Sequence, residues 1–236
     1  MNTFDIATRP TLTAISSMAT RQLLGELARV NVESGGTPVA LEAVGGVDAA
    51  KRVAAGEMFD LVFLASDALA KLVAGGHVLA DSRVDLVRSQ VAIAVKSGLP
   101  VPAITTAADV RSAVLNVASI GYSTGPSGTA LLALFERWGI TAETKSKLRQ
   151  APAGVPVATM VANGDVALGF QQRSEMIDAP GINVIGDLPA EIAIETIFSG
   201  GVCAASTRVA EARALLAAFA APARSGIKTK HGMAAI

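Results

Sequence analysis

The stretch IGYSTGPSGTALLALFERWGI, residues 120–140, joins a short apolar run to a turn rich in glycine and hydroxyl groups and then to an amphipathic helical pattern. Apolar residues of the helical part recur every three to four positions, which fixes its buried face and leaves its first turn open. The stretch therefore predicts a strand, a tight polar turn and a helix N-terminus. Free N–H groups and the helix dipole there favour an anion without any lysine.

The hydroxyl groups of this turn admit two interpretations. Ser123, Thr124, Ser127 and Gly128 are interpreted as a site for a carboxylate or another oxyanion. The alternative is that Ser127 only caps the helix and that the glycines only turn the chain. A cap needs one hydroxyl, so the density of hydroxyls favours the anion site. Tyr122 borders the turn, where it either donates a hydrogen bond or packs against the core.

Composition narrows the classes of partner. The chain has 236 residues and a net charge of +0, with 20 basic and 20 acidic residues and no long basic run. Nucleic acid and anionic membrane surfaces are therefore not expected as partners. The mean hydropathy of +0.47 comes from short segments. None of them reaches the roughly eighteen apolar residues that a membrane span needs.

Cysteine and histidine do not point to a metal or to a cofactor. Cys203 is the single cysteine and lies in an apolar run, so we expect it to be a small buried hydrophobe. The two histidines, His77 and His231, lie far apart without companions at ligand spacing. His231 is expected to be a solvated residue of the tail. The sequence thus predicts neither a metal site nor a cofactor.

The first residues carry no charged leader followed by an apolar core, and residues 3–8 are predicted to form the first strand. The localisation predicted for the sequence as written is cytoplasmic. It is periplasmic if an export signal has been removed.

Short runs of β-branched residues alternate with alanine-rich helical patterns, which is typical of an α/β fold with mainly parallel strands. The number of strands suits two sheets better than one. We therefore predict two lobes, the first made of residues 1–84 and 205–236 and the second of residues 85–204. The hinge is expected near Asp85 and near Gly200.

Polar turns follow successive predicted strands, and ligands bind at that edge of open α/β sheets. The order of these turns resembles that of the periplasmic molybdate-binding protein family. Three segments carry the likeness, namely VAAGEMFDLVFLASD at 53–67, IGYSTGPSGTALLALFERWGI at 120–140 and VPVATMVANGDVALGFQQRSE at 155–175. The resemblance implies a type II two-lobed solute-binding fold that closes on a small anion in a cleft between its lobes. A transporter is the implied partner if the protein is exported.

The predicted site departs from that family at two loops. Where the family presents serine hydroxyls to the ligand, this sequence offers the loop Arg9–Thr13 and the pair Gly45-Gly46. An arginine fork beside backbone N–H groups suits a small di- or tricarboxylate better than molybdate. The residues expected to bind ligand are Arg9, Thr11, Thr13, Gly45, Gly46, Tyr122, Ser123, Thr124, Ser127, Gly128, Val155 and Gln171.

A second resemblance leads to an enzymatic alternative. Aconitate isomerase is similar to members of the same superfamily, and it moves a proton along an unsaturated tricarboxylate. Such a reaction needs clamps for the anion and one acid–base group within reach of the proton. The sequence supplies the clamps but identifies no base. Asp67 is a candidate, although a capping role for the helix expected from Ala68 is favoured.

Overall fold

The structure is a computed structural model that describes residues 10–152 and 154–236. The chain divides into two compact units, the first made of residues 1–88 and 197–236 and the second of residues 89–196. Strands β4 (Val84–Lys96) and β9 (Glu195–Val202) each contain residues of both units. Within the described part of the chain, no helix is both long and apolar enough to span a membrane.

Three parallel strands form the heart of the first unit. Strand β1 (Leu12–Ser17) lies between β2 (Val39–Val44) and β3 (Leu61–Ala65), and β9 is antiparallel to β3. Parallel neighbours need a crossover connection, which α1 (Arg21–Glu33) and α2 (Gly46–Ala54) provide. The carboxyl ends of β1, β2 and β3 therefore share one edge of the sheet, which we call the unit 1 edge.

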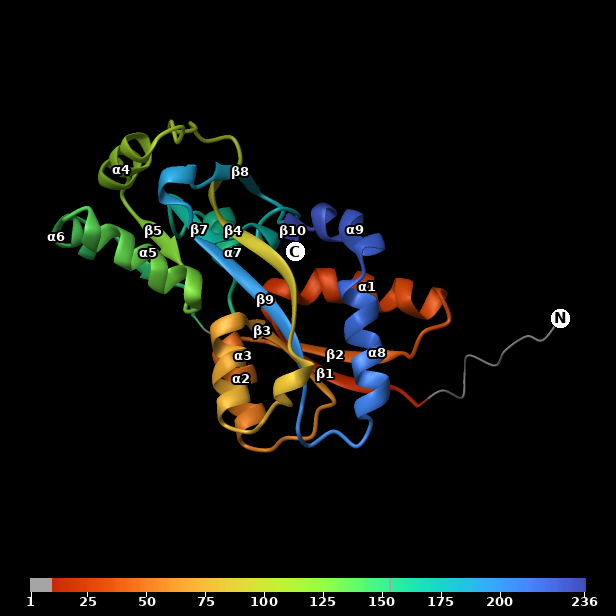
Figure 1. The fold of residues 1–236 in the computed structure, drawn as a ribbon. Helices are drawn as coiled ribbons and strands as arrows, with labels where there is room; N and C mark the ends of the chain where they lie inside the picture. Colours follow the sequence, from red (N-terminus) through yellow and green to blue (C-terminus); the bar gives the residue numbers. More distant parts are fainter. Residues whose placement is uncertain (1–9, 153) are drawn as a thin grey trace. The chain divides into compact units, whose positions relative to one another are not determined.

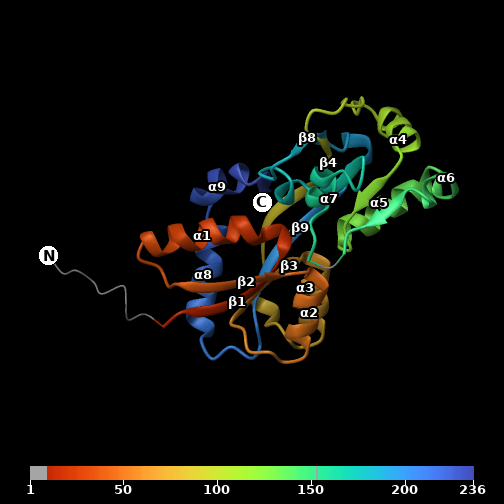
Figure 2. The same cartoon turned by 180° about the vertical axis from the view of Figure 1, so that it is seen from behind.

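Helices cover both faces of this sheet (Figures 1 and 2). On one face, leucines of α1 pack with α8 (Val209–Ala220), where Phe219 stacks on Phe63 with ring centroids 6.0 Å apart. On the other face, α2 and α3 (Ser66–Ala74) pack on Ile15, Val62 and Leu64. Because β3 is buried on both faces, its sequence LVFLA is a continuous hydrophobic run.

The strands of the second unit pair in a mixed arrangement. Strand β7 (Leu168–Gln172) is antiparallel to β4 and parallel to β5 (Ile120–Tyr122), and β5 is parallel to β6 (Leu148–Gln150). Strand β8 (Ile182–Asp187) pairs with the other side of β4. Helices α4 (Ala107–Asn116) and α5 (Pro126–Arg137) pack on one face and α7 (Val157–Asn163) on the other. The carboxyl ends of β5 and β7 form the unit 2 edge.

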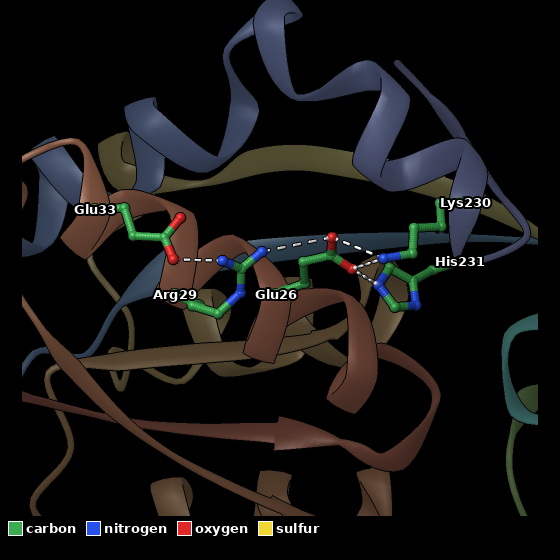
Figure 3. Close-up of polar contacts among 5 residues, drawn as sticks. All are labelled: Glu26, Arg29, Glu33, Lys230 and His231. Carbon is green, nitrogen blue, oxygen red and sulfur yellow. Dashed lines mark hydrogen bonds and ion pairs between the residues drawn. The ribbon is translucent and has the colours of Figure 1, made fainter.

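The end of the chain is tied to the first unit through Glu26 of α1 (Figure 3). Both carboxylate oxygens of Glu26 accept from Lys230 Nζ at 2.9 Å, and Oε2 lies 2.7 Å from His231 Nε2. Hydrogen bonds from Lys230 and His231 lower the pKa of Glu26. The expectation that His231 is solvated is wrong, because the residue is only 8% exposed at the end of α9 (Ser225–Lys230).

Most expected elements are present, with shifted ends. The short elements α6 (Thr141–Lys145), β6, α9 and β10 (Met233–Ala235) were not predicted, because segments of three to six residues carry too little periodicity. The expected first strand, residues 3–8, and Arg9 lie outside the described residues. The expected loop Arg9–Thr13 is wrong in its described part, since Leu12 and Thr13 belong to β1.

Candidate functional site

The unit 1 edge begins at Ser17, the last residue of β1. Its side chain is only 7% exposed, and its Oγ has no hydrogen-bond partner among the described residues. A buried hydroxyl without a partner costs free energy, so native proteins rarely keep one without a reason. Ser17 was not among the predicted ligand residues. Ser17 was missed because the first strand was predicted at residues 3–8. The two serines that directly follow Leu12–Ile15 are a sequence feature from which it could have been found.

Thr11 and Thr13 lie at the opposite end of β1 from Ser17. Thr13 donates its backbone N–H to Asp60 Oδ2 at 2.9 Å, so it links β1 to the residue that precedes β3. Strand β1 spans six residues, which separates its two ends by about 17 Å. The two threonines therefore do not belong to the unit 1 edge, and the expectation that they line the site is corrected.

Gly45 and Gly46 lie at the unit 1 edge, as expected. Helix α2 begins at Gly46, so Gly45 is its N-cap. A Cβ on Gly46 would lie 3.5 Å from Ser17 Cβ, which places the start of α2 against the Ser17 side chain. The N–H groups of a first helical turn have no partner within the helix. A buried hydroxyl and backbone donors thus meet at one point of this edge.

Ser66 is a further polar residue of the unit 1 edge and the first residue of α3. Its Oγ lies 2.6 Å from Ser199 Oγ, and Ser199 Oγ donates to Asp85 Oδ1 at 2.5 Å. Asp67 is exposed in the first turn of α3, which has no side-chain cap. The capping role expected of Asp67 is therefore wrong, because the helix begins at Ser66, two residues before the expected start at Ala68.

The hydroxyl-rich turn of the unit 2 edge has the predicted strand, turn and helix, but Ser127 does not cap α5. Gly125 is the N-cap, and the buried Ser127 Oγ lies 2.9 Å from Ser123 Oγ. A Cβ on Gly128 would overlap the carbonyl oxygen of Ser123. Glycine is therefore required at position 128 for α5 to pack on the turn. Tyr122 packs against the core of the unit, and Thr124 is exposed.

Gln171 is buried on β7 and caps α7. Its Oε1 accepts from Ala158 N at 3.3 Å, and a hydrogen bond from Gln171 lowers the pKa of Glu175. The Val155 N–H donates to the Pro152 carbonyl at 3.0 Å. The backbone donor expected at Val155 and the Oε1 acceptor of Gln171 are therefore already used within the unit. Gln172, on the other face of β7, donates to Thr196 Oγ1 at 2.7 Å.

Glu175 was not predicted as a functional residue. It lies three residues beyond β7 in a short 3-10 turn, Arg173–Glu175, and is partly buried. Burial raises the pKa of Glu175 to about 7, and the Gln171 hydrogen bond opposes this shift only in part. A carboxyl group with such a pKa can take up or release a proton near neutral pH. No sequence motif marks it, because the shift comes from the packing around it.

Two further observations concern metal-ligating side chains and the single cysteine. Across residues 10–152 and 154–236, no group of three or more histidine, cysteine, aspartate or glutamate side chains is placed to hold a metal ion. Cys203 is buried, as expected, and burial together with the charge of Asp60 raises the pKa of its thiol to about 12. The thiolate form that nucleophilic chemistry requires is therefore scarce.

Comparisons with known proteins agree with this arrangement. Over 166 residues the chain is 40% identical to the aconitate isomerase of a Pseudomonas species, an alignment that covers 70% of this chain and 63% of that enzyme. The chain therefore spans less than two thirds of the length of this relative. The fold is similar to that of the Azotobacter vinelandii periplasmic molybdate-binding protein, with a TM-score of 0.78, 18% identity and coverage of 94% and 98% of the two chains.

A sulfate-binding protein from Mycobacterium tuberculosis has the same fold, with a TM-score of 0.74, 14% identity and coverage of 95% of this chain and 86% of that one. The predicted two-lobed α/β fold of solute-binding proteins is thereby confirmed. Residues 12–234 match the model of one family, which covers nearly all of the described chain. The chain belongs to the bacterial extracellular solute-binding proteins.

Proposed function

We propose that this protein binds a small polyanion at the unit 1 edge, as a solute-binding protein. The observation that carries the proposal is Ser17, whose buried Oγ lacks a partner beside the start of α2. An anion at this point would accept from Ser17 and from the first N–H groups of α2. Two structural relatives are named for binding the oxyanions molybdate and sulfate, which supports the same chemistry here.

The described residues do not support the predicted preference for a carboxylate over an oxyanion such as molybdate. The preference for a carboxylate rested on Arg9, which the structure does not describe, and on the apparent lack of a serine in the first loop. Ser17 supplies that serine at the end of β1. A tetrahedral oxyanion and a small carboxylate are therefore both retained, and the experiment below separates them. A periplasmic location and delivery to a membrane transporter belong to this proposal.

A second candidate function is isomerisation of a small unsaturated carboxylate. The aconitate isomerase relative supports it, and Glu175 adds a specific observation because its pKa of about 7 suits proton transfer. In this proposal Glu175 removes a proton from one carbon of the bound acid and returns it to another along the allylic system. No cofactor is needed for this proton shift.

Thermal unfolding in the presence of molybdate, sulfate, citrate and cis-aconitate tests the primary proposal. A ligand at a hundred times its dissociation constant raises the free energy of unfolding by about 2.7 kcal/mol. We expect Ser17→Ala to weaken binding of the stabilising anion by about tenfold or more. The exposed Ser112→Ala serves as control. If none of the four anions stabilises the protein, the primary proposal is wrong.

Proton exchange separates the two candidate functions. Incubation of the protein with cis-aconitate or trans-aconitate in heavy water would incorporate deuterium if the protein is an isomerase, and Glu175→Gln would abolish the incorporation. If these acids bind but no deuterium is incorporated at high protein concentration, the isomerase function is excluded and the solute-binding function is retained.

A further inference from the structure

Three oxygen atoms of the first unit form a continuous hydrogen-bonded chain. Ser66 Oγ, at the start of α3, lies 2.6 Å from Ser199 Oγ on β9. Ser199 Oγ lies 2.5 Å from Asp85 Oδ1 on β4. Ser199, in the middle of this chain of atoms, is fully buried, whereas Ser66 and Asp85 at its two ends are partly exposed. The three residues come from three different elements.

Counting protons fixes the direction of these hydrogen bonds. Arg83 Nε and Nη2 lie 3.2 and 3.1 Å from Asp85 Oδ1, an ion pair in which the Asp85 carboxylate can only accept. The Ser199 hydroxyl must therefore donate its single proton to Asp85. The only way for Ser66 and Ser199 to share a hydrogen bond is then for Ser66 to donate. The proton of Ser66 points into the protein, and its lone pairs alone face outward.

Ser66 lies close to the other groups of the unit 1 edge. The pairing of Ser16 with Phe63 sets Ser17 level with Leu64 on the adjacent strand. Ser66 follows two residues beyond Leu64, so strand spacing places it about 8 Å from Ser17. That distance is within the span of one small polyanion. An anion held by Ser17 and by the start of α2 would therefore extend to Ser66.

We propose that Ser66 is a specificity-determining residue that accepts a hydrogen bond from the bound anion, so that this site selects anions with an O–H donor. Monohydrogen phosphate and hydroxycarboxylates have such a donor, whereas sulfate and molybdate do not. A fully deprotonated oxyanion would set an oxygen against the lone pairs of Ser66. The inference rests on the proposed anion-binding function, and it adds the substrate class.

Two pairs of matched anions test the proposal. Phosphate and sulfate have the same shape and charge at mildly alkaline pH, but only phosphate carries a proton. Citrate and tricarballylate have the same three carboxylates, but only citrate has a hydroxyl. Calorimetry should show that phosphate binds more tightly than sulfate, and citrate more tightly than tricarballylate, by about tenfold to a hundredfold. Equal affinities within both pairs would overturn the proposal.

Variants attribute the preference to Ser66. Ser66→Ala should remove the preference within each pair, and Ser199→Ala should free the Ser66 hydroxyl to donate, which raises the affinity for sulfate. The exposed Ser112→Ala should keep the preferences of the wild type. A Ser66→Ala protein that unfolds like the wild type and still prefers phosphate would contradict the role of Ser66.

Neutron diffraction of deuterium-exchanged crystals tests the hydrogen-bond direction without a ligand. A deuteron of Ser66 on the side of Ser199, with the Ser199 deuteron toward Asp85, is the expected result. A Ser66 deuteron that points away from Ser199 would overturn the inference even if anions bind. Failure of every anion to bind would instead contradict the proposed function, so the two failures are distinguishable.

Discussion

The unit 1 edge and the unit 2 edge differ in how their polar groups are used. In the unit 2 edge, the hydroxyls of Ser123 and Ser127 bond to each other and Gln171 caps α7, although Gln172 Oε1 at the end of β7 has no partner among the described residues. In the unit 1 edge, Ser17 Oγ has no partner within the described part of the chain, and Gly46 lies directly against it. The denser cluster of hydroxyls is therefore the better satisfied one. The number of hydroxyls in a turn is a weaker guide to a ligand site than a buried hydroxyl that lacks a partner.

Gly128→Ala should give the largest effect, because it breaks the packing that shapes the unit 2 edge. The new Cβ would overlap the Ser123 carbonyl, so we expect the free energy of unfolding to fall by about 3 kcal/mol. Gly25→Ala is the matched control. It lies in α1 with nothing within 4 Å of the added carbon, and it should stabilise by about 0.5–1 kcal/mol. Equal denaturant midpoints for the two variants would contradict the requirement for glycine at position 128.

Gln171→Met tests whether the buried glutamine of the unit 2 edge is structural. The variant leaves the Ala158 N–H of α7 without its acceptor, and we expect a loss of about 2 kcal/mol in the free energy of unfolding. It also removes the hydrogen bond that lowers the pKa of Glu175, so that pKa should rise further. Gln150→Met, at an exposed position of β6, is the control in urea unfolding and NMR titration. A Gln171→Met protein as stable as the control would show that the hydrogen bond to Ala158 N does not stabilise the fold.

The pH dependence of stability should reveal Glu175. Its pKa in the folded state, about 7, lies above the ordinary value of 4.5, so the folded protein binds the proton more tightly than the unfolded chain. Stability should therefore fall as pH rises from 4.5 to 7 and then level off. Because Glu175 is partly solvated, we expect Glu175→Gln to gain only about 1–2 kcal/mol over the wild type above neutrality. Parallel pH profiles of the two proteins would contradict the raised pKa.

Ser127→Ala should give the smallest effect and sharpens the comparison of the two edges most directly. Its hydroxyl bonds to Ser123, so we expect a loss of about 1 kcal/mol or less in stability. Anion affinity should change less than in Ser17→Ala, as measured by calorimetry with the stabilising anion. If Ser127→Ala weakens binding more than Ser17→Ala does, the unit 2 edge dominates recognition and the comparison is reversed.

The sequence was sufficient to predict the α/β alternation and the amphipathic face of α5. Leu131, Leu134 and Phe135 form part of the core of the second unit, as their spacing indicates. The position of the first described strand was not predicted correctly. Residues 3–8 have the same β-branched, apolar character as Leu12–Ser17, and local propensity does not distinguish them. The pairing of Leu12–Ser17 with β2 and β3 places the carboxyl end of this strand at Ser17, and this pairing is a long-range contact that local sequence does not show.

The sequence by itself determined the periodicities, the breaks between elements and the family, because these depend on neighbouring residues. Only the tertiary structure decided which polar side chains have hydrogen-bond partners within the protein. Ser66 and Ser199 are 133 positions apart, and Ser199 and Asp85 are 114 apart. Each hydroxyl can donate only one hydrogen bond. Which acceptor receives that bond therefore depends on the residues that long-range strand pairing brings next to the hydroxyl. The raised pKa of Glu175 depends on tertiary packing for the same reason, because burial and not residue type shifts it.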